Sequence, residues 1–204
     1  MKQIKLTGLL LIGLLTGLHG LSQSASTCEG ESISFTAPSS EEWQWQKRVT
    51  VDWQDVVDAG AYQGSQTQIL SISPVALDMN GDSLRCLIPS VLTGELDSVA
   101  VAEELIVYPF IEPSIIGFDP EPQLPICYGS NAPLIVQNLV PSGGEEEFEQ
   151  IWQIFENNEW NDIAGSPDQI DLGVLTESVS VRQQIANLSG ICSVVYSNVL
   201  EIPV

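Results

Sequence analysis

The side chains that could perform chemistry in this sequence are almost all carboxylates. Its 204 residues include 27 Asp and Glu, six Lys and Arg and one histidine. That histidine, His19, lies in an apolar N-terminal stretch, so the rest of the chain has no imidazole. Nucleophilic catalysis by a Ser-His-Asp or Cys-His arrangement and histidine-ligated metal sites are therefore excluded in their usual forms.

A chain rich in carboxylates could still bind cations or hydrolyse glycosides. The segment DMNGDS places Asp78, Asn80 and Asp82 at the alternating positions that a calcium loop uses. Its glycine falls between Asn80 and Asp82 and the closing Glu is missing, so we interpret it as a turn whose residues are weak metal candidates. Paired carboxylates could cleave a glycosidic bond without histidine, but small β-domains joined in a row seldom enclose the necessary cleft. We expect no catalytic residues, no resident metal and no cofactor.

The N-terminus has the features of a secretory signal peptide. Lys2 and Lys5 precede an apolar run of 13 residues, and small residues follow that run. Because a membrane-spanning helix needs about 20 apolar residues, we predict a signal peptide at residues 1–22 and no membrane insertion after its removal. The predicted location is secreted or cell envelope: periplasm, outer surface or medium.

Removal of this leader leaves a strongly acidic chain. Four basic residues remain against all 27 acids, which gives a net charge of −23. Such a chain would gain nothing from counterion release on nucleic acid or on an anionic membrane, so we expect neither as a partner. The acidic run at 145–149 is interpreted as a solvated loop.

The chain after the leader shows β-strand patterning. Segments rich in β-branched and aromatic residues alternate with turns of Gly, Asn, Asp and Pro, and no segment has a convincing helical period. Five prolines between positions 109 and 125 resist a central strand. We therefore place a junction near residue 110, with one domain at 23–109 and a second at 110–204.

Two stretches repeat one skeleton 107 residues apart. WQKRVTVDWQDV, which starts at Trp45, and WQIFENNEWNDI, which starts at Trp152, share Trp-Gln, a second Trp eight residues later, and Asp before a β-branched residue. Further residues match in the same order: Cys28 with Cys127, and Arg85 with Arg182. The repeat predicts one structural unit written twice.

The order of these residues fits an immunoglobulin-type sandwich. In that fold one indole on the third strand fills the centre of a core about 10 Å thick between two sheets, and we assign this role to Trp45 and Trp152. Trp43 shares a strand face with Trp45, while Trp53 and Trp160 lie eight residues beyond the core tryptophans. These three are interpreted as half-buried strand positions, with a docking patch for glycan or protein as the functional alternative.

The segments CEGESISFTA, WQWQ, WQDV and DMNGDSLRCLI resemble the Ig-like modules of secreted Bacteroidota surface proteins. The second half is similar to a related repeat of gliding and adhesion proteins, through its P-x-GG turn, its WNDIAG hairpin and its YSNV strand. The resemblance covers nearly the whole mature chain and implies an all-β fold of two tandem immunoglobulin-like β-sandwich domains. It says little about function, because such folds host many activities.

Four cysteines in an exported chain predict two disulfides, and three pairings are open. We favour Cys28–Cys86 with Cys127–Cys192, since each bond then stays within one repeat. Cys28–Cys86 would cross the first core beside Trp45, and Cys127–Cys192 would clip the ends of the second unit. Removing either bond would cost about 2–5 kcal/mol.

The sequence therefore favours an exported, non-catalytic Ig-like module for cell-surface adhesion, recognition or scaffolding. Its expected partner is a protein or glycan at the cell surface, bound by end loops or exposed edge strands. The alternative from another class is a carboxylate-dependent carbohydrate-processing enzyme or its carbohydrate-binding accessory. A passive spacer in a larger envelope assembly is a third hypothesis.

Overall fold

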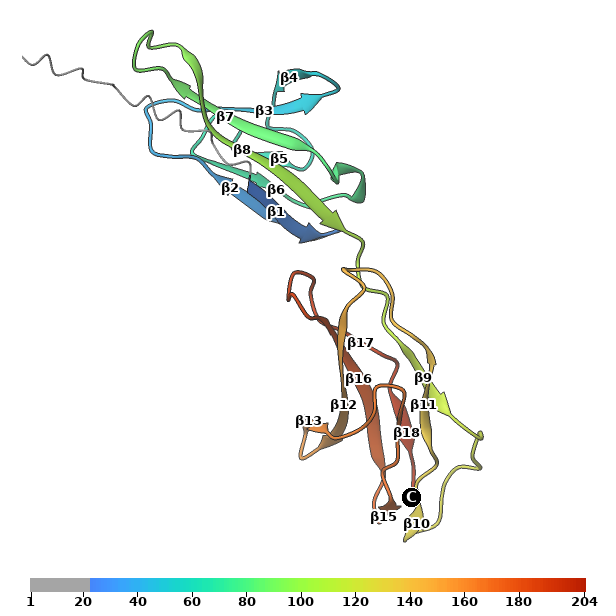
Figure 1. The fold of residues 1–204 in the computed structure, drawn as a ribbon. Coiled ribbons are helices and arrows are strands. Elements are labelled where there is room, and N and C mark those ends of the chain that lie inside the picture. The colour runs from blue at the N-terminus through green and yellow to red at the C-terminus, as the bar shows by residue number, and fades with distance from the viewer. Residues whose placement is uncertain (1–22) are drawn as a thin grey trace, which may run out of the picture.

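A computed structural model of the chain describes residues 23–204. The predicted signal peptide lies outside the described residues. The described chain is all-β: its strands are joined by turns, and its one helical element is a single 3₁₀ turn, η1 (Leu77–Met79). The strands form two immunoglobulin-like β-sandwiches placed end to end, called here domain 1 (β1–β8) and domain 2 (β9–β18) (Figure 1). Within residues 23–204, no helix has the length and hydropathy needed to cross a membrane.

Domain 1 packs a five-stranded sheet on a three-stranded one. The larger sheet has the order β1 (Gln23–Cys28), β8 (Leu96–Tyr108), β7 (Ser83–Pro89), β3 (Gln44–Val49) and β4 (Asp52–Asp55). The smaller sheet has the order β2 (Ile33–Thr36), β6 (Ile69–Ile72) and β5 (Tyr62–Gln63). Strand β1 runs parallel to β8, whereas the other pairs are antiparallel.

Domain 2 repeats this plan with a more broken edge. Its larger sheet contains β13 (Glu159–Ile163), β12 (Phe148–Glu156) and β16 (Val179–Asn187), with β17 (Val195–Tyr196) and β18 (Leu200–Ile202) both paired to β16. The facing sheet has the order β14 (Gln169–Ile170), β11 (Ile135–Leu139) and β9 (Ile115–Phe118). A short pair, β10 (Ser130–Asn131) with β15 (Val174–Leu175), lies at the end remote from domain 1 (Figure 1).

An indole lies at the centre of each core. Trp45 and Trp152 are 0% and 1% exposed, and each belongs to the main apolar cluster of its own domain. Each buried indole N–H is satisfied by a backbone carbonyl, Trp45 Nε1 by Thr67 O at 3.0 Å and Trp152 Nε1 by Ser166 O at 2.6 Å. Burial of a large ring costs little when its one polar atom keeps a hydrogen bond.

Candidate functional site

The repeated residues outside the core form a ladder across the outer face of three strands. In domain 1, Gln46 on β3 donates from Nε2 to Asp55 Oδ1 on β4 at 2.7 Å. The same amide accepts at Oε1 from Arg85 Nε on β7 at 2.8 Å. The Arg85 guanidinium lies over the ring of Trp53, 4.3 Å from its centroid. Burial lowers the pKa of this guanidinium.

Domain 2 has the same ladder on β13, β12 and β16. Gln153 donates to Asp162 Oδ1 at 2.8 Å and accepts from Arg182 Nε at 2.9 Å. The Arg182 guanidinium carbon lies 4.1 Å from the centroid of Trp160 and 3.8 Å from that of Tyr196. The sequence repeat thus encodes a cross-strand network that locks the register of a hairpin against the next strand.

The three tryptophans for which a docking patch was the functional alternative do not gather on one surface. Trp53 and Trp160 lie in different domains, and an arginine covers a face of each ring. Trp43 packs against the core of domain 1 and donates from Nε1 to Pro38 O at 3.0 Å. All three are half-buried.

Two of the residues considered as calcium ligands, Asn80 and Asp82, interact with other groups of the protein. Asn80 Oδ1 accepts from the amide of Val107 at 2.9 Å, which ties the turn after η1 to β8. Asp82 Oδ2 lies 2.5 Å from Lys47 Nζ in a salt bridge, while Asp78 is exposed. In residues 23–204, no group of three or more His, Cys, Asp or Glu side chains is arranged to hold a metal ion.

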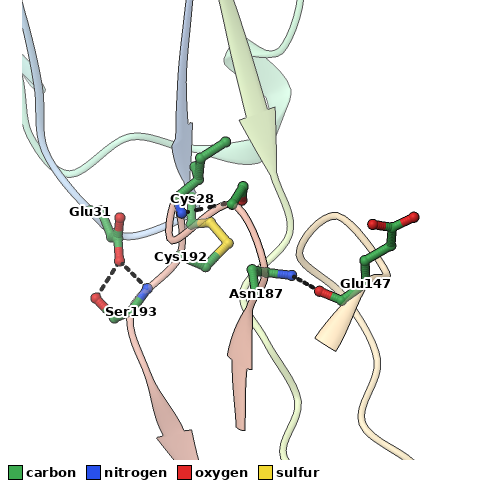
Figure 2. The surroundings of a disulfide bond; sticks show 8 residues. Cys28, Glu31, Glu147, Asn187, Cys192 and Ser193 are labelled. Atoms are coloured by element: carbon green, nitrogen blue, oxygen red, sulfur yellow. Dashed lines mark hydrogen bonds between the residues drawn. A yellow bond between two sulfur atoms is a disulfide. The ribbon is translucent and has the colours of Figure 1, made fainter. Parts of the chain in front are cut away.

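The disulfide pairing differs from the one favoured by the sequence. Cys28, at the end of β1, is bonded to Cys192, in the loop between β16 and β17, so the bond joins the two domains (Figure 2). Cys86 and Cys127 are free thiols, Cys86 buried and Cys127 exposed. The expected pairs Cys28–Cys86 and Cys127–Cys192 are therefore wrong.

The error has a simple structural cause. Cys28 lies on the strand that pairs with β8, and the strand facing the core from the opposite sheet is β2. On β2 the core position is taken by Phe35, whose ring centroid lies 6.3 Å from that of Trp45. Cys86 pairs with Trp45 across β7 and β3. An aromatic ring thus replaces the half of the cystine that the second sheet usually supplies in this fold.

The bond is the centre of a junction between the domains. Cys28 and Cys192 are buried with Ile111 and Ile185, and Tyr108 and Phe148 pack against them. Glu31 of domain 1 accepts hydrogen bonds from the amide of Ser193 at 2.9 Å and from its hydroxyl (Figure 2). The junction combines a covalent bond, an apolar cluster and a charge-assisted hydrogen bond, which together limit hinge motion.

The P-x-GG turn, which contains Gly143 and Gly144, and the acidic loop that follows it also contact the junction. Gly144 donates to Pro109 O at 2.9 Å, and a Cβ on Gly143 would collide with the backbone of Phe110. Gly143 and Gly144 have φ of 84° and 55°, so this tight approach requires residues without a side chain. A hydrogen bond from Tyr108 to Glu145 raises the pKa of the tyrosine.

A buried glutamine stands in domain 2 where domain 1 has Cys86. Gln183 is fully buried on β16 and pairs with Trp152. Its Oε1 accepts from Ser114 Oγ at 2.7 Å and Gln137 Nε2 at 3.1 Å, and its Nε2 donates to Pro167 O at 2.7 Å. Hydrogen bonds of Gln183 therefore link strands and loops around the second core, at the position where domain 1 has a cysteine.

A hollow of about 640 Å³ opens on the flank of domain 2, between β13 and the segment that carries β14 and β15. We call it the domain 2 groove. Its exposed lining is mainly polar and includes four carboxylates, with nearly buried apolar side chains between them; the lining includes Ile154, Ile170, Leu175, Val179, Glu156, Asp162, Asp171 and Glu177. All four acids are solvent-exposed. Among the described residues that line it, there is no Lys or Arg.

In domain 1 a lysine occupies the position of Ile154, and the nearby hollow of about 490 Å³ has a different lining: Asp58, Ala59, Gly60, Tyr62 and Gln63. Lys47 corresponds to Ile154 in the repeat, and its ammonium reaches Asp82 and, at 3.4 Å, the Tyr62 hydroxyl. Burial disfavours the charged amine, but the hydrogen bond to Asp82 and the charges of Tyr62 and Asp82 outweigh it, so the pKa of Lys47 is raised. Sequence reasoning missed the groove, although the change from Lys to Ile within the repeat was visible.

No family model matches the chain, and no curated protein matches it. Among solved structures, the chain is similar to the N-terminal four Ig domains of Dscam1 isoform 8.4, with 13% identity, a TM-score of 0.40, and coverage of 98% of this chain and 45% of that chain. It is also similar to the N-terminal eight Ig domains of Down Syndrome Cell Adhesion Molecule isoform 1.30.30, with 12% identity, a TM-score of 0.37, and coverage of 89% and 24%. The chain thus spans less than half the length of these proteins.

Proposed function

We propose that this protein is an exported, non-catalytic recognition module of the cell surface, with adhesion or scaffolding as its role. A disulfide joins its domains, and stable disulfides belong to oxidising compartments. The predicted signal peptide and the resemblance to Ig-like modules of secreted Bacteroidota surface proteins support the same location. The observation that carries a binding role is the domain 2 groove.

The chemistry of the groove favours an extended protein segment that alternates basic and apolar side chains. The carboxylates of its lining favour lysine or arginine, and the apolar side chains between them leave a small area for aliphatic groups. The chain carries 27 acids and six Lys and Arg in total, so its long-range field adds to this attraction. The proposed partner is a protein that presents such a segment at the outer surface.

The edge of β13 offers a second means of attachment. Strand β13 pairs with β12 on one side, and among residues 23–204 no strand pairs with its other side. It follows a two-residue turn, Asn157 and Asn158, with positive φ at both positions. Glu156 and Glu159 close that hairpin, so the backbone groups of Trp160 and Asp162 face outward by alternation. A bound segment would add a strand here while its side chains enter the groove.

The test uses a labelled nonapeptide of alternating lysine and valine and measures fluorescence anisotropy on the full chain. We expect saturable binding that weakens as salt rises and at least a tenfold loss of affinity in Glu156→Lys/Glu177→Lys. Ile154→Lys, which copies domain 1, should block the groove and weaken binding similarly. The matched control Glu95→Lys/Asp97→Lys changes charge equally on domain 1 and should retain most of the affinity.

Equal losses in the groove and control variants would show that the peptide responds to net charge alone, and the groove would lose its assignment. The hydrolase alternative is tested with chromogenic glycosides, on which we expect no turnover. A glycosidase acid works with a raised pKa in a shielded site, whereas the groove carboxylates are exposed. Turnover that disappears in Asp162→Asn would overturn the non-catalytic assignment. Saturable binding on a glycan array would replace the protein partner by a carbohydrate.

A further inference from the structure

A single disulfide encloses most of both domains. Cys28 and Cys192 are 164 positions apart in the sequence, so the bond between them closes a covalent loop that contains residues 29–191. Among the described strands, β1 comes before this loop, and β17 and β18 come after it. All the other strands of the described chain belong to the loop.

The three strands outside the loop are attached at the edges of the larger sheets. Within residues 23–204, β1 pairs with β8 alone, and β17 and β18 each pair with β16 alone. No strand of the loop therefore depends on them for a place between two neighbours, and the two cores are built mainly from strands inside the loop.

These outer strands follow one line along the molecule. Strand β1 runs towards the junction and ends at Cys28, while β17 and β18 run from the junction towards the far end of domain 2 (Figure 1). The register of β17 and β18 on β16 differs by one residue, so a single bulge separates two extended segments. Extended backbone already spans about 3.3 Å per residue, which is close to its maximum. The route through these strands and the disulfide has little slack.

The pairing that the sequence favoured would place different segments on this route. Cys28–Cys86 and Cys127–Cys192 would leave residues 87–126 outside both loops. That segment contains β8, which lies between β1 and β7 in the larger sheet of domain 1. Pulling on the two ends would then remove a central strand. The bond between Cys28 and Cys192 takes this segment out of the route.

The bond is also protected from thiols. Cys28 and Cys192 are 2% and 5% exposed, and they are buried together with Ile111 and Ile185. Cleavage of a disulfide requires a thiolate to reach one of its sulfur atoms. The folded junction therefore shields the covalent link between the outer strands.

We propose that the protein has a further function as a tension-bearing tether, in which the Cys28–Cys192 bond carries force past both domains. Force that enters before Cys28 and leaves after Cys192 follows β1, the disulfide, β17 and β18. The two sandwiches lie beside this path and keep their fold, so a binding surface on either domain stays intact while the chain is pulled. This function does not depend on what the domain 2 groove binds.

The experiment is single-molecule pulling with optical tweezers on the full chain. Handles are attached at Ser24 and Glu201, two exposed positions outside the loop. We expect the native protein to lengthen by less than about 2 nm, because its force path is already extended. Cys28→Ser/Cys192→Ser should lengthen by roughly 50 nm more, since the 164 residue steps of the loop are then released at about 3.3–3.6 Å each.

A second pulling geometry separates this protection from high stability in general. Handles at Glu42 and Val140 are exposed and lie inside the loop. The shorter covalent route between them includes residues 140–192, so the force passes through domain 2 although the disulfide is present. We expect unfolding and a lengthening of roughly 10 nm or more. This measurement keeps both cysteines, so it remains informative if the double variant fails to fold.

The proposal fails if the native protein lengthens by roughly 50 nm when pulled from Ser24 and Glu201. It fails equally if the native protein resists both pulling geometries, if removal of the bond adds no length, or if non-reducing peptide mapping finds another cysteine pairing. Peptide binding by the domain 2 groove is measured without force, so failure of either proposal is visible separately.

Discussion

Domains 1 and 2 are nearly the same on the outer face of the larger sheet and unlike at the centre of the sandwich. Both carry the ladder of Asp, Gln and Arg with a tryptophan beneath the guanidinium. Beside the core indole, however, domain 1 has the thiol of Cys86 and the ring of Phe35. Domain 2 has the amide of Gln183 with two side-chain partners, Ser114 and Gln137, and the backbone carbonyl of Pro167.

The difference indicates which residues specify the fold and which only fill it. The ladder fixes strand register, and a slip by one residue would move every side chain to the wrong face. The centre of the core needs only matched volume and satisfied polar atoms. A ring with a thiol and a hydrogen-bonded amide are two solutions to that one requirement.

The flanks of the two domains differ in a way that bears on function. Lys47 fills the flank of domain 1 through its contacts with Asp82 and Tyr62. Ile154 leaves the corresponding flank of domain 2 open as the domain 2 groove. Domain 1 therefore serves as an internal control for any binding assigned to domain 2.

The largest expected effect comes from removing the core indoles. Trp45→Ala and Trp152→Ala should each lower the free energy of unfolding by about 3–5 kcal/mol, because each leaves a large cavity and an unpaired carbonyl. Hydrogen-exchange mass spectrometry should place the loss in the mutated domain and leave the other domain protected. Equal loss of protection in both domains would contradict the view that each sandwich has its own core.

The next effect distinguishes the two centres. Gln183→Leu should destabilise domain 2 by about 2–4 kcal/mol, since Ser114, Gln137 and Pro167 O lose a buried partner. The matched change Cys86→Ala in domain 1 removes a thiol with only one weak hydrogen bond, and should cost about 1 kcal/mol. Chemical denaturation followed by hydrogen exchange measures both. A larger loss from Cys86→Ala would reverse the comparison.

A smaller effect should separate the two ladders. Arg182 lies between two rings, those of Trp160 and Tyr196, whereas Arg85 contacts one. Lysine keeps the charge but loses planar stacking. Arg182→Lys should therefore cost about 1–2 kcal/mol and Arg85→Lys about 0.5–1 kcal/mol. Similar losses in thermal denaturation would mean that Tyr196 contributes no binding to the guanidinium.

Much of the fold could be predicted because the repeat shows residues with a fixed geometric role. Trp45, Trp152 and the strand alternation around them indicate a two-sheet sandwich, and the structure has that all-β fold. The ladder could have been inferred from the same matches, since Gln46, Arg85 and their counterparts Gln153 and Arg182 recur in the same order.

The disulfide could not be predicted because it depends on how two domains meet. Cys28 lies seven residues before Phe35, the β2 residue that faces the core. The sequence order Cys, Trp, Cys therefore suggested a bond inside one sandwich, although the first cysteine belongs to the preceding strand. The domain 2 groove was missed for a different reason: the change from Lys47 to Ile154 is visible in the repeat, but no local pattern shows whether another side chain fills the same flank.

The smallest expected effect concerns the thiol of Cys86, which has no counterpart in the core of domain 2. Burial raises its pKa to about 11 from a usual value of 9.0, so the unfolded chain ionises this group at lower pH than the folded one. The stability it confers is complete below the unfolded pKa and is lost as pH rises from about 9 towards 11. Between pH 8 and 10, the melting temperature of domain 1 should fall more steeply in the native protein than in Cys86→Ser.

Iodoacetamide at pH 8 should modify Cys127 alone in the folded protein and both free cysteines after unfolding. Rapid labelling of Cys86 in the folded state would show that the first core opens, and the contrast between a sealed thiol and a hydrogen-bonded amide would no longer describe the two domains.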